Sequence, residues 1–264
     1  GTVRQLTTRK GPDSNPTPSP DGRKIAYVGF DFRHQSYSVT HLYVMNSDGS
    51  DPKLLTETLD RDVSSPRWSP DSKTIYFTAD DRGVTYVYAA TLDGKLRRVS
   101  NTRHRFTGYG LPEAFSVAAN GRVAAMRSTP KEPYDIITFT LDRPDEVTRL
   151  SGVNDSLLAD RAIGEVEEIT YRSFDGRPIQ GWIIKPPGFD SSKKYPLILE
   201  IHGGPHYMYG VEFSHELQSY AGRGFVVLYT NPRGSTGYGE EFGNIIHTKY
   251  PGDDYKDLMA GVDV

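Results

Sequence analysis

The sequence contains no cysteine among its 264 residues. This absence excludes disulfide bonds, thiolate metal sites and a cysteine nucleophile. It also suits a reducing compartment, so we expect a cytoplasmic protein.

An excess of charge of either sign is missing as well. The 31 basic and 34 acidic residues give a formal net charge of -3, so the chain lacks the basic footprint of proteins that bind nucleic acids or anionic membranes. Long hydrophobic runs are also missing. The longest purely apolar runs, such as Phe225–Tyr229, fall far short of the roughly 20 residues that span a bilayer. Neither a nucleic acid nor a membrane is therefore expected as a partner.

The start of the chain carries no recognisable signal peptide. The first residue is Gly1 rather than Met, which leaves open a natural N-terminus further upstream.

What is present is an internal repeat in residues 1–151, with a period of about 45 to 50 residues. Residues 16–31 (PTPSPDGRKIAYVGFD) match residues 66–81 (PRWSPDSKTIYFTADD), and residues 115–128 (FSVAANGRVAAMRS) form a weaker third copy. Each copy is followed by a similar second half, at 41–56, 86–100 and 135–151.

Each unit of the repeat has the pattern of short antiparallel strands. Asp21-Gly22 supplies a tight turn, and alternating apolar residues such as Ile25 and Tyr27 follow it on one face. Asp48-Gly49 and Asp93-Gly94 are placed to turn the last two strands of their units. A single Ser-Pro-Asp-Gly would indicate only a surface turn, whereas three copies in register favour repeated sheets.

This repeat resembles the TolB-like propeller repeat, which implies that residues 1–151 are blades of a β-propeller. Only about three blades are present, so this segment cannot close a ring by itself. We therefore expect a partial propeller.

From residue 152 the pattern changes to that of an α/β sheet. A hairpin is expected around Asp175-Gly176, and the apolar runs at 195–201 and 224–230 are typical of strands covered on both faces. A helix is expected between these runs, within 211–224. A second helix is expected to begin at Asp253, which suits the N-cap.

Two loops rich in glycine and proline, IHGGPH at 201–206 and NPRGSTGYG at 231–239, follow the two apolar runs. The spacing of His202 and His206 suits two metal ligands on a helix, but the Gly-Gly-Pro between them disfavours a helix. A phosphate site is disfavoured because no Lys-Ser/Thr follows either set of glycines. The third interpretation is an oxyanion hole, in which backbone N–H groups after a buried strand face a developing negative charge.

The second half resembles the prolyl oligopeptidase family of serine peptidases, and most of all its acylaminoacyl peptidase branch. The resemblance rests on residues 164–189 (GEVEEITYRSFDGRPIQGWIIKPPGF), 195–206 (YPLILEIHGGPH) and 224–242 (GFVVLYTNPRGSTGYGEEF). It implies that residues 152–264 are the start of an α/β-hydrolase peptidase domain that follows the propeller. It also implies short peptides as substrates and no cofactor or metal.

The resemblance also implies roles for particular residues. The Gly204 N–H would donate to the oxyanion, and His202 and Gly203 would shape the loop. Pro205, Arg233 and Tyr238 would lie near the active site, with Arg233 anchoring loops rather than touching substrate.

The nucleophile of the family is missing from this sequence. No Gly-x-Ser-x-Gly occurs, and Ser235 in GSTG is one residue short of it, so Ser235 is interpreted as a turn hydroxyl. The serine, aspartate and histidine of the triad would all follow Val264, so no catalytic residue is expected here and the chain alone is expected to be inactive. The rest of the same polypeptide is then its expected partner, and exposed strand edges leave self-association open.

The other candidate residues have structural interpretations. His215 and His247 are expected on the surface, Glu240 and Glu241 as solvated charges, and Trp68 and Trp182 in the core. Two other functions remain open. One is an esterase or lipase that uses the same oxyanion loop, and the other is a propeller scaffold that only binds a partner.

Overall fold

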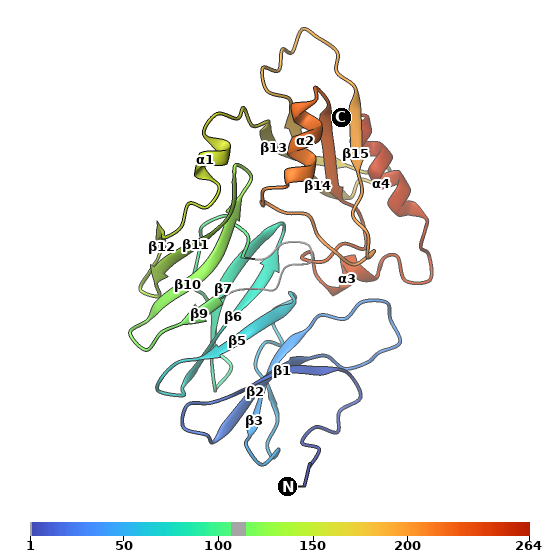
Figure 1. The fold of residues 1–264 in the computed structure, drawn as a ribbon. Helices are drawn as coiled ribbons and strands as arrows, with labels where there is room; N and C mark the ends of the chain where they lie inside the picture. Colours follow the sequence, from blue (N-terminus) through green and yellow to red (C-terminus); the bar gives the residue numbers. More distant parts are fainter. Residues whose placement is uncertain (1, 107–114) are drawn as a thin grey trace.

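Three four-stranded antiparallel sheets form the first part of the computed structural model, which describes residues 2–106 and 115–264. In each sheet the strands are neighbours in the order of the sequence, and the sheets follow one another along the chain (Figure 1). The strands are β1 (Asp13–Pro18), β2 (Lys24–Gly29), β3 (His41–Asn46) and β4 (Lys53–Leu54); β5 (Val63–Trp68), β6 (Thr74–Asp81), β7 (Val84–Thr91) and β8 (Leu96–Arg98); β9 (Phe115–Val117), β10 (Arg122–Thr129), β11 (Glu132–Thr140) and β12 (Arg143–Arg149).

The sequence repeat corresponds to a repeated turn between the first two strands of each sheet. Ser19 N–H donates to the Lys24 carbonyl, Ser69 N–H to Thr74 and Ala118 N–H to Arg122, each at 2.8 Å. The expected turns at Asp48-Gly49 and Asp93-Gly94 are confirmed between the last strands of the first two sheets, where both glycines have positive φ.

Successive sheets pack against each other through apolar faces. One core cluster joins strands of the first two sheets, and another joins β7 to β9, β10 and β11. Trp68 is 7% exposed, and its Nε1–H donates to the Thr17 carbonyl of the first sheet at 2.8 Å. Trp182 is 1% exposed, so the prediction that both tryptophans lie in the core is confirmed.

A buried histidine in the segment after β8 makes stability depend on pH. His104 is 2% exposed, and burial, together with Arg127, lowers its pKa to about 4. An unfolded chain binds this proton near pH 6.5. Between pH 6.5 and about 4 the unfolded state therefore carries a proton that the folded state rejects, which lowers the free energy of unfolding by roughly 3 kcal/mol.

Replacement of this histidine tests that dependence. His104→Gln is expected to flatten the loss of stability between pH 7.5 and 4.5, measured by urea unfolding at both values. The exposed His215 provides the control, because His215→Gln removes an exposed ring and leaves the buried His104 ring in place, so its pH slope should persist. An unchanged pH slope in His104→Gln would contradict this assignment.

The fourth sheet is mixed and lies beyond the first three in Figure 1. A long hairpin, β13 (Glu165–Arg172) and β14 (Pro178–Lys185), turns at Asp175-Gly176 as expected. The strand β14 pairs antiparallel with β16 (Val226–Asn231), which pairs parallel with β15 (Leu197–Glu200).

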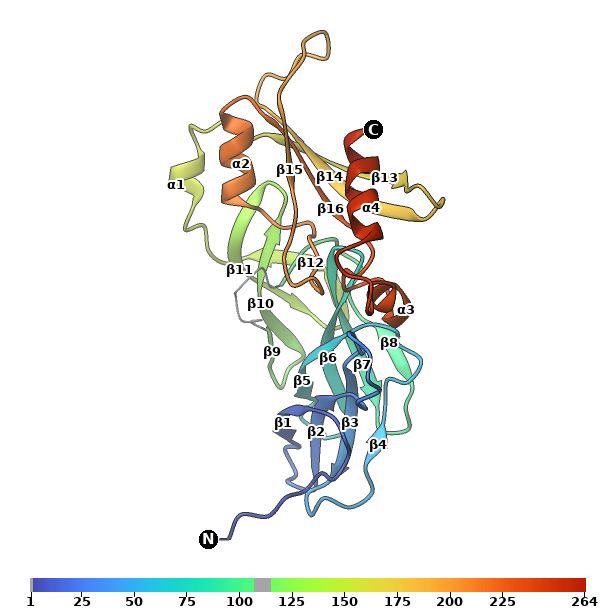
Figure 2. The same cartoon turned by 90° about the vertical axis from the view of Figure 1, so that its right-hand side faces the viewer.

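Helices cover both faces of this sheet. Figure 2 shows α2 (His215–Gly222) and α4 (Asp253–Val262) on opposite sides, where they pack on β14 and β16 and on β13 and β16, respectively. Two short helices lie in connecting segments: α1 (Asp155–Leu158) between β12 and β13, and α3 (Glu240–Asn244) between β16 and α4. Among the described residues, no helix is both long and apolar enough to cross a membrane.

Two local expectations are wrong. The run at 195–201 is not covered on both faces: Leu197 is 41% and Ile201 52% exposed, because β15 is an edge strand paired only with β16. Asp253 is not an N-cap, because it is the first helical residue. Gly252 is the N-cap, and its N–H donates to Asp254 at 2.6 Å.

Candidate active site

Two loops leave the fourth sheet at the same end of its parallel strands. Because β15 and β16 are parallel, the HGG loop (residues 201–211) and the PRG loop (residues 232–239) both begin at carboxyl ends of strands, which is where α/β folds place their sites. The loops bind each other directly. Thr236 N–H donates to the Tyr207 carbonyl at 2.9 Å, and His206 Nδ1–H donates to the Gly234 carbonyl at 2.8 Å.

A buried asparagine reinforces this pairing of loops. The Asn231 side chain, at the end of β16, accepts from Tyr209 N–H at 2.8 Å and donates to the Tyr209 carbonyl at 2.9 Å. The amide thus imitates a neighbouring strand and fixes the path of the HGG loop.

His202 joins the two loops through its ring. The Ser235 hydroxyl donates to the Pro232 carbonyl at 2.7 Å and lies 2.9 Å from His202 Nε2, while His202 Nδ1 lies 3.0 Å from the Gly203 carbonyl. Burial lowers the pKa of His202, which favours the neutral ring. Ser235 is fully buried and has the contacts of the turn hydroxyl expected from the sequence.

The geometry also bears on the metal interpretation of the two histidines. His202 and His206 lie in a loop without helical structure, so their spacing does not place them on one helical face. Among the described residues, no group of three or more metal-ligating side chains is present.

The glycines of the HGG loop differ in conformation. Gly204 has φ +125°, and a Cβ there would lie 2.9 Å from His206 N, whereas a Cβ on Gly203 would meet nothing within 4 Å. The backbone hydrogen bonds between described residues outside helices and strands include none from Gly204 N–H, so this amide is not part of a strand ladder. Pro205 is half-buried.

A cavity of about 460 Å³ adjoins the HGG loop and the hairpin of the third sheet. Its lining includes His202 and Gly203 from the loop but not Gly204. Tyr134 of β11, in the third sheet, also lines it. Glu212 also lines it, and burial raises the pKa of this carboxyl although Arg105 lies 3.4 Å away.

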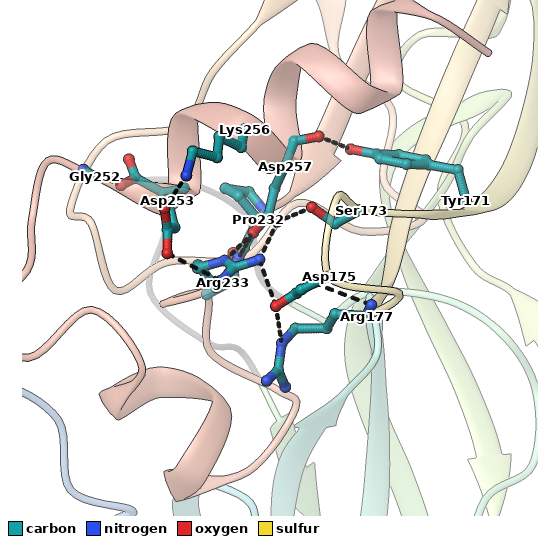
Figure 3. A network of polar contacts seen from close by, with 12 residues as sticks. Tyr171, Ser173, Asp175, Arg177, Pro232, Arg233, Gly252, Asp253, Lys256 and Asp257 are labelled. Carbon is teal, nitrogen blue, oxygen red and sulfur yellow. Dashed lines mark hydrogen bonds and ion pairs between the residues drawn. The ribbon is translucent and has the colours of Figure 1, made fainter.

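Arg233 belongs to the PRG loop and is buried, and its guanidinium points toward Asp257 and Asp175 (Figure 3). Its Nε–H and Nη2–H donate to the two oxygens of Asp257 at 2.8 and 2.7 Å. The backbone N–H of Arg233 donates to the same carboxylate at 2.8 Å, and Asp175 lies 3.2 Å from Nη2. This geometry suits an anchor for loops rather than contact with substrate.

The partner of Arg233 was not found from the sequence. Asp257 is fully buried in α4 and also accepts from Ser173. An acidic residue on the apolar face next to Leu258 was the available signal.

Tyr238 lies apart from the first cavity. It lines a second cavity of about 530 Å³ with Arg82, Glu168 and Gln180. Its hydroxyl donates to Gln180 and accepts from Asn231. The structure therefore brings His202 and Gly203 together at one cavity and places Tyr238 at another.

The remaining candidates differ in exposure. His215 and Glu241 are exposed as expected, and His247 is half-buried in the turn after α3. Glu240 was wrongly interpreted as a solvated charge. Its carboxylate accepts from Gln35 at 2.7 Å and from Val39 N–H at 3.0 Å, because α3 docks on the segment that connects β2 to β3.

The fourth sheet has one parallel pair of strands, helices on both faces and a His-Gly-Gly loop at the carboxyl end of β15, which are features expected at the start of an α/β-hydrolase domain. Comparison with known proteins identifies the class further. The family model "Prolyl oligopeptidase family" matches residues 211–264. The chain belongs to this family of serine peptidases, as the resemblance in the sequence indicated.

Relatives and solved structures agree with this assignment. The chain is 35% identical over 198 residues to the uncharacterised peptidase YuxL of Bacillus subtilis, covering 75% of this chain and 29% of the relative. It is 29% identical over 260 residues to dipeptidyl-peptidase 5 of Aspergillus fumigatus, covering 95% and 35%. The structure of Pyrococcus horikoshii acylaminoacyl peptidase matches with a TM-score of 0.76 and 26% identity, covering 92% and 36%. The chain thus spans about a third of the length of these relatives.

Proposed function

We propose that the protein hydrolyses short peptides by acyl-enzyme chemistry, as an acylaminoacyl peptidase or oligopeptidase. In this proposal the three antiparallel sheets are blades of a larger propeller, and the fourth sheet begins an α/β-hydrolase domain. The HGG loop supplies the oxyanion hole, and the serine, histidine and aspartate of the triad come from the rest of the polypeptide.

The observation that supports this function is the position of the HGG loop. It follows a strand at the carboxyl edge of the sheet, its Gly204 N–H is free of ladder pairing, and its Gly203 faces a cavity of about 460 Å³. That volume suits a few residues of a peptide. Part of the lining comes from the third sheet, so the blades would limit access to short substrates.

In this mechanism the triad forms and breaks the bonds, and the HGG loop of this chain stabilises the negative charge. A serine hydroxyl attacks the scissile carbonyl, its proton passes to histidine, and negative charge develops on the carbonyl oxygen. Backbone N–H groups of the HGG loop, with Gly204 first among them, stabilise this charge. The carbon–nitrogen bond then breaks as histidine protonates the leaving amine, and water hydrolyses the resulting ester by the same steps in reverse order.

A fluorophosphonate probe tests this function in the full-length polypeptide. We expect one labelled serine outside residues 1–264 and undiminished labelling of Ser235→Ala, because Ser235 is fully buried and donates to a carbonyl. Labelling that disappears in Ser235→Ala would make Ser235 the nucleophile. Absence of any labelled serine would refute a serine hydrolase and favour a binding scaffold.

Matched substrates separate a peptidase from an esterase. An aminoacyl anilide and an ester with the same acyl group should both be turned over substantially by a peptidase. Hydrolysis of the ester alone would reject the peptidase assignment.

A further inference from the structure

The turn between β6 and β7 reaches from the second sheet into the candidate active site. It consists of Arg82 and Gly83, which have φ +49° and φ +79°. Two successive residues with positive φ are typical of a type I′ turn, the tight connection that matches the twist of a hairpin. The strands behind it are held in the core, where Phe77 is fully buried and Val84 is 1% exposed.

All four backbone polar groups of this turn bind the second half of the chain. Arg82 N–H donates to the Gly237 carbonyl of the PRG loop at 3.1 Å, and the Arg82 carbonyl accepts from the Gln180 side chain of β14 at 3.2 Å. Gly83 makes the other two contacts, both with the HGG loop: its N–H faces Met208 Sδ at 3.1 Å, and its carbonyl accepts from Val211 N–H at 2.9 Å.

Glycines allow this close approach. A Cβ on Gly83 would lie 2.8 Å from the buried Trp182 ring and 3.1 Å from Gly210 Cα. A Cβ on Gly210 would lie 2.3 Å from the Gly83 carbonyl oxygen, and a Cβ on Gly237 would lie 2.3 Å from Met208 Sδ. The turn and the HGG loop therefore meet almost backbone to backbone, and the buried Met208 side chain packs against both the turn and the PRG loop.

From these contacts we propose that the Arg82-Gly83 turn is a positioning element that fixes the HGG and PRG loops relative to each other, with Gly83 as its central residue. The proposal rests on the proposed function, because it assigns the HGG loop to catalysis. The turn itself touches no reacting atom. It sets the path of the loop whose amides face the developing charge, and a misplacement of about 1 Å can cost about 100-fold in rate.

Two glycines with nearly the same backbone conformation provide the test. Gly83 has φ +79° and Gly94 has φ +84°, but a Cβ on Gly94 would meet nothing within 4 Å. Both alanine variants carry the same backbone strain, and only Gly83→Ala pushes against the loops. In the full-length polypeptide we expect Gly83→Ala to lower kcat about 10- to 100-fold with KM changed less than about threefold, and Gly94→Ala to stay within about twofold of the unchanged protein.

Rates are counted per active site, by titration with the fluorophosphonate probe, so that loss of folded protein does not imitate a loss of kcat. A second variant, Met208→Leu, keeps an apolar side chain of similar volume but removes the sulfur that faces Gly83 N–H. It should lower kcat per site a few-fold in the same direction, and it decides the question if Gly83→Ala yields no folded protein.

The outcomes separate this proposal from the proposed function. Equal kcat per site in Gly83→Ala, Met208→Leu and Gly94→Ala would overturn the positioning role while leaving the peptidase intact. Absence of probe labelling and hydrolysis in the unsubstituted protein would overturn the proposed function and this inference with it.

Discussion

Replacement of Asp257 by alanine is expected to lower the free energy of unfolding by about 3–5 kcal/mol, the usual effect of removing one partner of a buried ion pair. Asp257 is fully buried, and the Arg233 side chain is 4% exposed. The substitution leaves the guanidinium in the interior without the carboxylate that accepts two of its hydrogen bonds, and it also removes the acceptor of the Arg233 backbone N–H. Hydrogen bonds to Asp257 are the main reason why the pKa of Arg233 is raised.

Chemical denaturation of the two single variants and of Arg233→Ala/Asp257→Ala measures this coupling. The double variant should lose less stability than the sum of the single variants, because it leaves no buried charge unpaired. Asp253 provides the control: its carboxylate is 3.9 Å from Arg233 but 51% exposed, so Asp253→Ala should cost much less stability than Asp257→Ala. Additive losses, or equal losses for Asp253→Ala and Asp257→Ala, would contradict a buried ion pair.

Local patterns were sufficient to predict most of the secondary structure. The turn sequences of the repeat, Pro-Asp-Gly at 20–22, Pro-Asp-Ser at 70–72 and Asn-Gly at 120–121, predicted the hairpins of the first three sheets because such turns depend on two or three adjacent residues. The hairpin at Asp175-Gly176 and the helix within 211–224 were predicted for the same reason. The burial of 195–201 was overestimated, because an apolar strand has the same sequence at the centre of a sheet and at its edge.

Contacts between distant segments were not predictable in this way. The sequence pointed to the HGG and PRG loops, because glycine and proline directly after apolar strands are a local signal. The partners of these loops carry no such signal. Asp257 meets Arg233 across 24 residues, and Gly83 meets Met208 across 125. A single sequence does not contain the register of such pairs, so Glu240 was interpreted as a solvated charge and Asp257 was not identified as the partner of Arg233.

Substitution of Gly204 by alanine is expected to lower kcat by about 10²- to 10³-fold, the effect of losing one donor of an oxyanion hole. Alanine retains the N–H, but φ +125° is a conformation that residues with a Cβ rarely adopt, and the new Cβ would lie 2.9 Å from His206 N. The backbone must rotate to relieve this contact, and the rotation turns the amide away from its direction in the HGG loop. KM should change less than kcat, because the donor acts on charge that develops only in the transition state.

Gly188→Ala separates this effect from backbone strain alone, since Gly188 has φ +71° and its Cβ would meet nothing within 4 Å. Both variants of the full-length polypeptide are compared in kcat and KM for an aminoacyl anilide. Gly203 lines the cavity whereas Gly204 does not, so the neighbouring amide is the direct rival for the oxyanion. If Gly204→Ala retains the kcat of Gly188→Ala, the charge is stabilised elsewhere, and the Gly203 amide becomes the donor to examine. If kcat falls in Gly204→Ala but not in Gly188→Ala, the conformation of residue 204 directs the amides of the HGG loop toward the reacting carbonyl. Glycine alone adopts this conformation without strain.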